Sequence, residues 1–130
     1  MTFLGVDYGR SHVGVAVGDT DAKMAFPHKT FHGLPRVSVL EELRTLIRIN
    51  SAHRVIVGIP RGMHGEEGTL EREVREFAQQ LRMIGGVPVQ LMDERFTSDA
   101  AGKLRRDNPS ADEHALAAML ILQSYFDTSL

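Results

Sequence analysis

LGVDYGRSHVGVAVGD, residues 4–19, is the stretch that most restricts the folds open to this chain. It holds two apolar runs on either side of a polar turn that contains Gly9. In the second run, β-branched residues alternate with very small ones: Val13, Val15 and Val17 with Gly14, Ala16 and Gly18. Alternation of this kind has the period of a strand, so the stretch predicts a β-hairpin with one branched face and one small face.

Asp7 lies where the first apolar run of this hairpin breaks, at the expected end of a strand. A rigid sheet would hold the carboxylate in place while it reaches solvent, which suits a metal ligand or a residue that handles phosphate. An aspartate beside a turn also commonly caps its own backbone, and that structural role is the alternative for Asp7.

The composition favours one domain, residues 1–130, without disulfides. A chain of 130 residues with 42% hydrophobic content is large enough to bury a core. The absence of cysteine excludes zinc–thiolate sites and thiol catalysis and suits a reducing compartment. No apolar run approaches the length of a membrane span, so we expect a soluble, cytoplasmic protein. A net charge of -2 gives no overall positive field, so any contact with nucleic acid must be local.

The rest of the chain predicts strands and helices that alternate. The apolar run over 54–58 is typical of a strand buried on both faces of a parallel sheet. Ser38 and Ser110 each stand three residues before a glutamate, the spacing of a capping box. The elements predicted after the hairpin are an edge strand over 24–31, a helix over 39–49, a strand over 54–58, a helix over 70–81 that ends before Gly85, a strand over 87–92, a short helix after Ser98 and a closing helix from Ser110 to about Phe126.

Acidic residues recur at three places where apolar segments begin or end. They are Asp7, the pair Asp93 and Glu94, and the group Asp112, Glu113 and His114. Carboxylate oxygens suit Mg²⁺ or Mn²⁺, and two such ions can clamp an in-line displacement at a phosphodiester. This chemistry is that of a nuclease. The structural alternatives are pairing of Asp93 and Glu94 with Arg95, and a favourable charge at a helix N-terminus for the last group.

The histidines give a weaker signal. His114 shares a helical face with Ala117 and Ile121, so a hydrogen-bonded core histidine is its structural alternative. The other five, which include His12 and His32, show no shared ligand spacing. They therefore receive no predicted catalytic role.

Four motifs, in this order and spacing, resemble one known family. They are GVDYG (5–9) with GVAVGD (14–19), VGIP (57–60) with Met63 and Gly65, DERFTS (93–98), and AA (117–118) with ILQ (121–123). The chain resembles, over nearly its whole length, the YqgF family, also called RuvX, of ribonuclease H-like Holliday junction resolvases and pre-16S ribosomal RNA nucleases. The resemblance implies an α/β, ribonuclease H-like fold: a mixed five-stranded sheet, led by three antiparallel strands, with helices on both faces.

The resemblance also implies an acidic site across the carboxyl ends of strands one and four. It makes Asp7 the central metal-bridging carboxylate and Glu94 the second ligand, with Asp93 as its near neighbour. The residues themselves agree on the location, but their periodicity does not separate Asp93 from Glu94.

Two departures from the family pattern affect this site. The family usually has an aspartate one turn before the Ala-Ala pair of the closing helix, where this chain has His114. Related resolvase-like enzymes use a histidine on the last helix, so the third metal ligand is expected to be His114, or Asp112 reaching in from the helix start. The connection after Leu104 is also shorter than the basic loop of relatives.

Five basic residues are candidates for contacts with phosphates. They are Arg10, Arg95, Lys103, Arg105 and Arg106. Such contacts would make the affinity for nucleic acid fall steeply with salt. The alternative is solvated surface charge.

The combined expectation is a Mg²⁺- or Mn²⁺-dependent endonuclease that acts on structured RNA or branched DNA, in pre-16S rRNA 5′-end processing, Holliday junction resolution or both. A homodimer would suit the two symmetric cuts that a junction needs. Two other classes stay open. One is a non-catalytic nucleic-acid-binding or ribosome-assembly module that has lost a metal ligand. The other is a sugar-kinase or actin-like phosphotransferase, although such proteins normally close two domains over a nucleotide.

Overall fold

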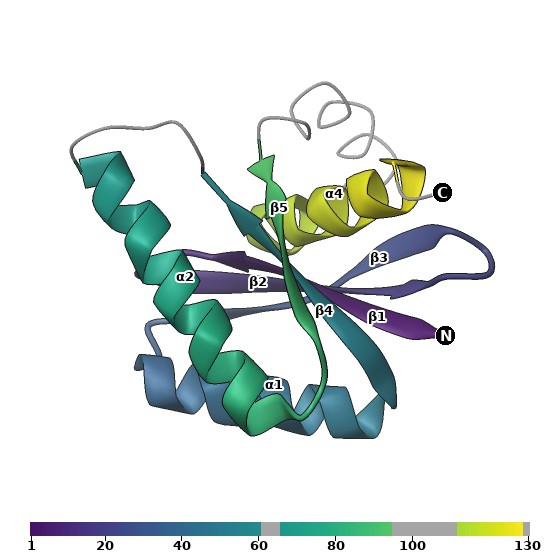
Figure 1. Ribbon diagram of the computed structural model, residues 1–130, viewed down its shortest axis with the longest axis horizontal. Coiled ribbons are helices and arrows are strands. Elements are labelled where there is room, and N and C mark those ends of the chain that lie inside the picture. Colours follow the sequence, from purple (N-terminus) through teal and green to yellow (C-terminus); the bar gives the residue numbers. More distant parts are fainter. Residues whose placement is uncertain (61–65, 95–111, 129–130) are drawn as a thin grey trace.

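A mixed five-stranded sheet forms the centre of the fold (Figure 1). The computed structural model describes residues 1–60, 66–94 and 112–128. The strands are β1 (Thr2–Tyr8), β2 (His12–Asp19), β3 (Met24–His32), β4 (Ala52–Ile59) and β5 (Val89–Asp93), and the helices are α1 (Arg36–Ile49), α2 (Glu66–Gly85) and α4 (Glu113–Thr128). The strands lie in the order β3-β2-β1-β4-β5. The first three pair antiparallel and β1, β4 and β5 pair parallel, as expected for the fold class.

The predicted hairpin is formed by β1 and β2. Its register places Asp7 opposite Gly14, and the turn is closed by the Gly9 amide, which donates to the His12 carbonyl at 2.9 Å. Val13 and Val15 are buried on the side of α1 and α2, whereas the small residues between them face α4. The two faces therefore accept helices at different distances, and α4 comes close to the backbone.

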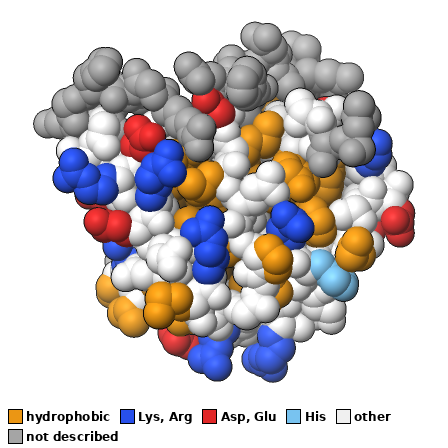
Figure 2. All heavy atoms as spheres, in the orientation of Figure 1, with side chains coloured by type: hydrophobic (Ala, Val, Ile, Leu, Met, Phe, Trp, Pro, Cys, Tyr) orange, Lys and Arg blue, Asp and Glu red, His pale blue; other side chains and the backbone are white. Residues whose placement is uncertain are grey.

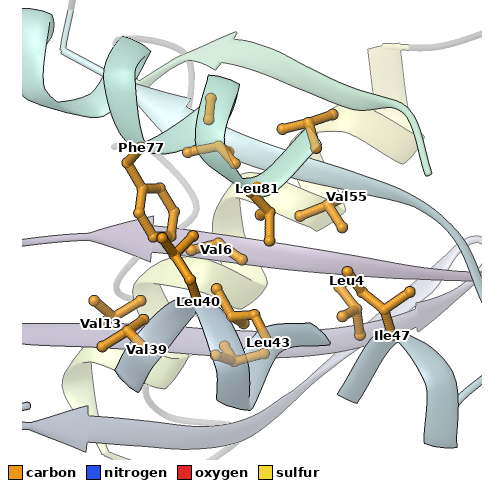
Figure 3. Packing of buried hydrophobic residues seen from close by; sticks show 14 of the residues in the cluster. Leu4, Val6, Val13, Val39, Leu40, Leu43, Ile47, Val55, Phe77 and Leu81 are labelled. Carbon is orange, nitrogen blue, oxygen red and sulfur yellow. The ribbon is translucent and has the colours of Figure 1, made fainter. Parts of the chain in front are cut away.

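The core consists of two layers, one on each face of the sheet. On one face, α1 and α2 pack against the branched residues of β1, β2 and β4, as Figure 3 shows for Leu43, Phe77 and Leu81 around Val6. On the other face, α4 supplies Leu122 and Met119 to a smaller cluster. Helices thus cover both faces of the sheet, as expected.

The ends of α1 differ in how well the sequence predicts them. The helix begins at Arg36, so the prediction of a start at Val39 capped by Ser38 is wrong. Pro35 precedes the helix in an extended conformation without a side-chain cap, and its carbonyl accepts the amides of Ser38 and Val39. Proline fixes its own φ but supplies no capping acceptor, so α1 begins without a side-chain cap. The predicted stop at Asn50 is confirmed.

Two other predicted elements lie partly or wholly outside the described residues. The closing helix starts at Glu113 and continues to Thr128. Ser110, expected to begin it, and the short helix expected after Ser98 lie outside the described residues. The 24–31 stretch is a full edge strand, and it meets β2 with a register shift beside Pro27.

The surface of the described chain carries mixed charge. On the face in Figure 2, lysine and arginine side chains lie between acidic and apolar ones rather than in one basic patch. This distribution agrees with the small net charge of the chain. None of the described helices combines the length and the apolar character that crossing a membrane requires.

Candidate active site

Two carboxyl groups face each other at one edge of the sheet. Asp7 is the penultimate residue of β1, and Glu94 follows β5 directly. β4 lies between these strands, and its Gly58 leaves space for Glu94: a Cβ at Gly58 would lie 2.8 Å from Glu94 Oε1. Glu94 therefore reaches across β4 to Asp7. The two carboxyl groups lie at the ends of β1 and β5, and not at the ends of strands one and four as expected, with Gly58 of β4 between them.

The two carboxyl groups share a hydrogen bond in which Glu94 donates to the Asp7 carboxylate. Burial, the Asp7 charge, the hydrogen bond and the charge of Asp93 together raise the pKa of Glu94 to about 8. Burial also raises the pKa of Asp7, although Glu94, His114 and His12 oppose this effect. Two like charges at such a half-buried place are unfavourable, so the pair holds a proton at neutral pH in the absence of a cation.

Asp93 and Glu94 point in different directions from β5. Gln90 of this strand accepts a hydrogen bond from the Tyr125 hydroxyl of α4, at 3.3 Å, and Met92 packs against the same helix layer. Side chains of a strand alternate between its faces, so Glu94 continues this series and Asp93 belongs to the other face. The structure thus separates two residues that the sequence pattern left equivalent.

His114 lies on the other side of Asp7, at the start of α4. Its backbone carbonyl sits over Gly14, where any Cβ would collide with it. Its ring stacks on that of His12, with centroids 3.5 Å apart and planes at 30°. Its Nε2 is also 3.6 Å from Glu113 Oε1, and 21% of its side chain is exposed. The imidazole is therefore partly exposed beside the candidate site rather than a core histidine.

Asp112 does not face Asp7 but caps α4. Its Oδ1 accepts the His114 amide and the Thr30 hydroxyl, both at 2.8 Å. Its Oδ2 lies 3.7 Å from His32 Nε2. The hydrogen bonds from His114 and Thr30 lower the pKa of Asp112. This geometry fits an N-cap that ties the helix to β3, and of the two candidates for third ligand only His114 lies beside Asp7.

His12 and His32 are site neighbours that the sequence analysis passed over. Both lie on the α4 side of the sheet, opposite each other in the β2–β3 pairing, and their ring centroids are 6.1 Å apart. The hairpin held the signal for one of them. If Gly14 pairs with Asp7, strand alternation places His12 on the same face, next to the carboxylate.

One of the five basic candidates lies in the described part of the chain. Arg10, in the turn between β1 and β2, is half-exposed and its Nε lies 2.8 Å from Glu73 Oε2 on α2. Arg95, Lys103, Arg105 and Arg106 lie outside the described residues.

The donor set beside Asp7 fits a magnesium-like ion. Across residues 1–60, 66–94 and 112–128, no three histidine or acidic side chains converge as a preformed metal cage. Mg²⁺ does not need one, since it keeps several waters and typically binds one or two carboxylates together with substrate phosphates. A half-buried carboxyl pair with raised pKa values is what a divalent cation would neutralise.

Comparison with known proteins gives close relatives along the whole chain. A protein of Chloroflexus aggregans is 33% identical over 98% of this chain and 94% of its own length. One of Anaeromyxobacter sp. is 36% identical over 98% of this chain and 97% of its own length. Both bear the name "Putative pre-16S rRNA nuclease".

Solved structures establish the fold. Thermus thermophilus RuvC in complex with a Holliday junction superposes with a TM-score of 0.75 at 15% identity, over 99% of this chain and 96% of that one. The fowlpox virus resolvase with Holliday junction DNA gives 0.60 at 10% identity, over 100% and 99%. The expected ribonuclease H-like architecture is thereby confirmed. A sequence model described as "RuvX: Holliday junction resolvase" matches residues 1–128, and the chain belongs to this family.

Proposed function

We propose that this protein is a nuclease that uses Mg²⁺ or Mn²⁺ to hydrolyse phosphodiester bonds in structured nucleic acid. The observation that carries the proposal is the hydrogen-bonded pair Asp7 and Glu94 at the sheet edge of a RuvX-family chain. The names of the relatives favour 5′-end processing of pre-16S rRNA, and the family description favours Holliday junctions. The working substrate class is RNA or DNA with a branched or folded structure.

Each residue of the site has a stated part in this proposal. Asp7 and Glu94 would hold the metal, with His114 as the third ligand. The ion, when bound, would activate water and neutralise charge on the scissile phosphate. Asp7 is fixed by the sheet and therefore gives the site its position, while Glu94 must lose its proton before it can bind a cation. Asp93 adds negative charge beside Glu94.

Contacts with the nucleic acid are assigned to the five basic residues that the sequence singles out. Arg10 lies in the turn between β1 and β2, where its guanidinium pairs with Glu73 of α2, and we assign to it a contact with a substrate phosphate. Arg95, Lys103, Arg105 and Arg106 complete the proposed set from sequence alone. A homodimer would bring two such sites to one junction.

The test is a cleavage assay with three substrates: a Holliday junction, single-stranded DNA and a precursor rRNA fragment. Each is incubated with Mg²⁺ and with Mn²⁺, using wild-type protein, Asp7→Asn and the control Asp21→Asn. Asp21 is an exposed aspartate at the opposite end of the hairpin. We expect metal-dependent cleavage that Asp7→Asn abolishes and Asp21→Asn leaves unchanged. Equal cleavage by Asp7→Asn under saturating Mn²⁺ would show that the site is assigned wrongly.

One observation favours a second candidate, a binding module without catalysis. His114 occupies the place of a usual family aspartate, and in the described chain no third carboxylate joins Asp7 and Glu94. Tight binding to all three substrates without cleavage in either metal would support this candidate over the nuclease.

A further inference from the structure

We propose that His12 is a positioning residue, which holds the His114 imidazole toward Asp7 by ring stacking. This inference rests on the proposed function, in which His114 is the third metal ligand. It assigns a role to a residue outside the carboxylate pair and the basic set.

Contacts around the start of α4 fix the backbone of His114 but not its ring. Its backbone is fixed, because its carbonyl lies against Gly14 and its amide donates to the N-cap Asp112. Its side chain still has two rotatable bonds, and the helical backbone leaves more than one staggered χ1 and a broad range of χ2 open to it. Something else must therefore set the direction of the ring.

The His114 ring also has an exposed acidic neighbour. Glu113, the neighbouring residue, has its Oε1 3.6 Å from His114 Nε2, and 71% of its side chain is exposed. The imidazole already contacts this carboxylate, which is largely in solvent. The pull is weak because the partner is solvated.

The imidazole of His114 stacks on that of His12. His12 and His114 have ring centroids 3.5 Å apart, the shortest ring contact recorded in the described chain. His32 meets both rings edge-on, at 6.1 and 6.2 Å. His12 comes from β2, whose pairing with β1 fixes it relative to Asp7. The stack thus links a ring on the helix to a ring whose backbone the sheet holds, beside the strand that carries Asp7, and it does so while His114 Nε2 also contacts Glu113.

This role depends on the flat ring and not on its nitrogens, which gives a sharp test. His12→Phe keeps a planar ring but no nitrogen, whereas His12→Leu has similar bulk without a ring. His12→Gln keeps a polar donor without a ring and serves if the leucine variant does not fold. His53→Leu is the matched control, since His53 is an exposed histidine at the opposite end of β4.

The primary readout is the affinity of the substrate-free protein for Mn²⁺, measured by calorimetry, with circular dichroism to verify folding. Loss of an outer partner of a metal ligand typically weakens metal affinity about 10- to 100-fold. We expect His12→Leu and His12→Gln to lose at least about tenfold, and His12→Phe and His53→Leu to stay within about threefold of wild type. Cleavage rates at subsaturating Mn²⁺ should follow the same order.

Two results would overturn the inference. If His12→Leu and His12→Gln bind Mn²⁺ as wild type does, the stack does not position His114. If His12→Phe loses as much as His12→Leu, a ring nitrogen is needed and His12 acts directly. Asp7→Asn and His114→Leu separate these failures from failure of the proposed site: if neither variant weakens Mn²⁺ binding, the site itself is wrong, whatever the His12 variants do.

Discussion

The carboxyl groups of Asp7 and Glu94 lie in hydrogen-bond contact across Gly58, although they are far apart in the sequence. Ionisation of either carboxyl group is unfavourable while the other is charged, because both are half-buried. The fold therefore keeps a proton at its candidate active site when no cation is present. The cost of losing that proton should appear in the stability of the metal-free protein.

The first prediction is the pH dependence of this stability. The pKa of Glu94 rises from its ordinary 4.5 to about 8 on folding. Between these values the folded protein binds more protons than the unfolded chain, so the free energy of unfolding decreases as pH rises. The contribution of Glu94 is fully present below about pH 4.5 and is lost as the pH passes about 8.

Urea unfolding from pH 5 to pH 8.5 in a chelator checks this dependence. Glu94→Gln, which cannot ionise, should flatten the decrease and should be more stable than wild type at pH 8.5. Addition of Mn²⁺ should stabilise wild type most at the high-pH end, since binding requires the ionised pair. A wild-type profile parallel to that of Glu94→Gln would contradict the assignment of the shared proton.

A second prediction concerns Gly58, whose missing side chain makes the carboxyl pair geometrically feasible. In Gly58→Ala the new Cβ would meet Ile121 and lie 2.8 Å from Glu94 Oε1. Overpacking of this kind typically costs about 1–3 kcal/mol of stability. We expect a loss in that range together with weaker metal binding, because Glu94 must move away from Asp7.

Gly85→Ala is the matched control, since its Cβ would meet only the ends of two flexible side chains, at 2.9 Å or more, and neither belongs to the carboxyl pair. Its effect should be limited to stability. Unchanged metal affinity in Gly58→Ala would mean that Glu94 does not reach the ion over this residue.

The local sequence pattern predicts the hairpin and Asp7, but it does not predict which acidic residue after β5 reaches Asp7. The alternation of Val13 and Val15 with Gly14 predicts both the hairpin and its faces, because strand period is a local property. Asp7 follows from the same pattern. The choice between Asp93 and Glu94 depends on where β5 ends and on the gap at Gly58, and both are consequences of strand pairing across the sheet.

The missed features have related causes. Ser38 has the spacing of a cap, but α1 begins directly after Pro35, whose carbonyl already accepts the Ser38 and Val39 amides. The contact of His12 with His114 joins two segments distant in sequence and depends on how closely α4 approaches β2. The spacing of histidines along the sequence does not predict such a contact. The small residues on one face of the hairpin do allow the helix to approach β2 closely enough for it.

A third prediction tests the start of α4. Asp112 accepts the His114 amide and the Thr30 hydroxyl, and its pKa is lowered by these hydrogen bonds. Its contribution to stability is therefore present above its ordinary pKa and is lost as the pH falls through the lowered value. Asp112→Asn keeps an accepting oxygen, while Asp112→Ala does not.

At pH 7 we expect a lower urea midpoint for Asp112→Ala and a nearly unchanged one for Asp112→Asn. At pH 3 the difference between the alanine variant and wild type should shrink. If the two variants lose equal stability at pH 7, the charge rather than the cap holds the helix start. Metal binding should weaken in Asp112→Ala alone, since His114 moves with the helix.

A fourth prediction concerns Arg10, which the free protein pairs with Glu73 at 2.8 Å. The arginine is half-exposed, and an ion pair at such a surface is worth only about 0–1 kcal/mol. A phosphate of the substrate can therefore displace the carboxylate. We expect Arg10→Ala to weaken binding to every tested nucleic acid alike and to reduce the salt-dependence slope by about 1.

Glu73→Gln should have the opposite effect on affinity, because it frees Arg10 without removing it. Its control is Glu41→Gln, which breaks an exposed pair with Arg44 on α1. Fluorescence anisotropy in Ca²⁺, over a series of salt concentrations, measures affinity and slope together. In the double variant Arg10→Ala with Glu73→Gln, the gain from the glutamine should vanish. A gain that persists there would place the effect of Glu73 in general repulsion of the substrate and not in its pairing with Arg10.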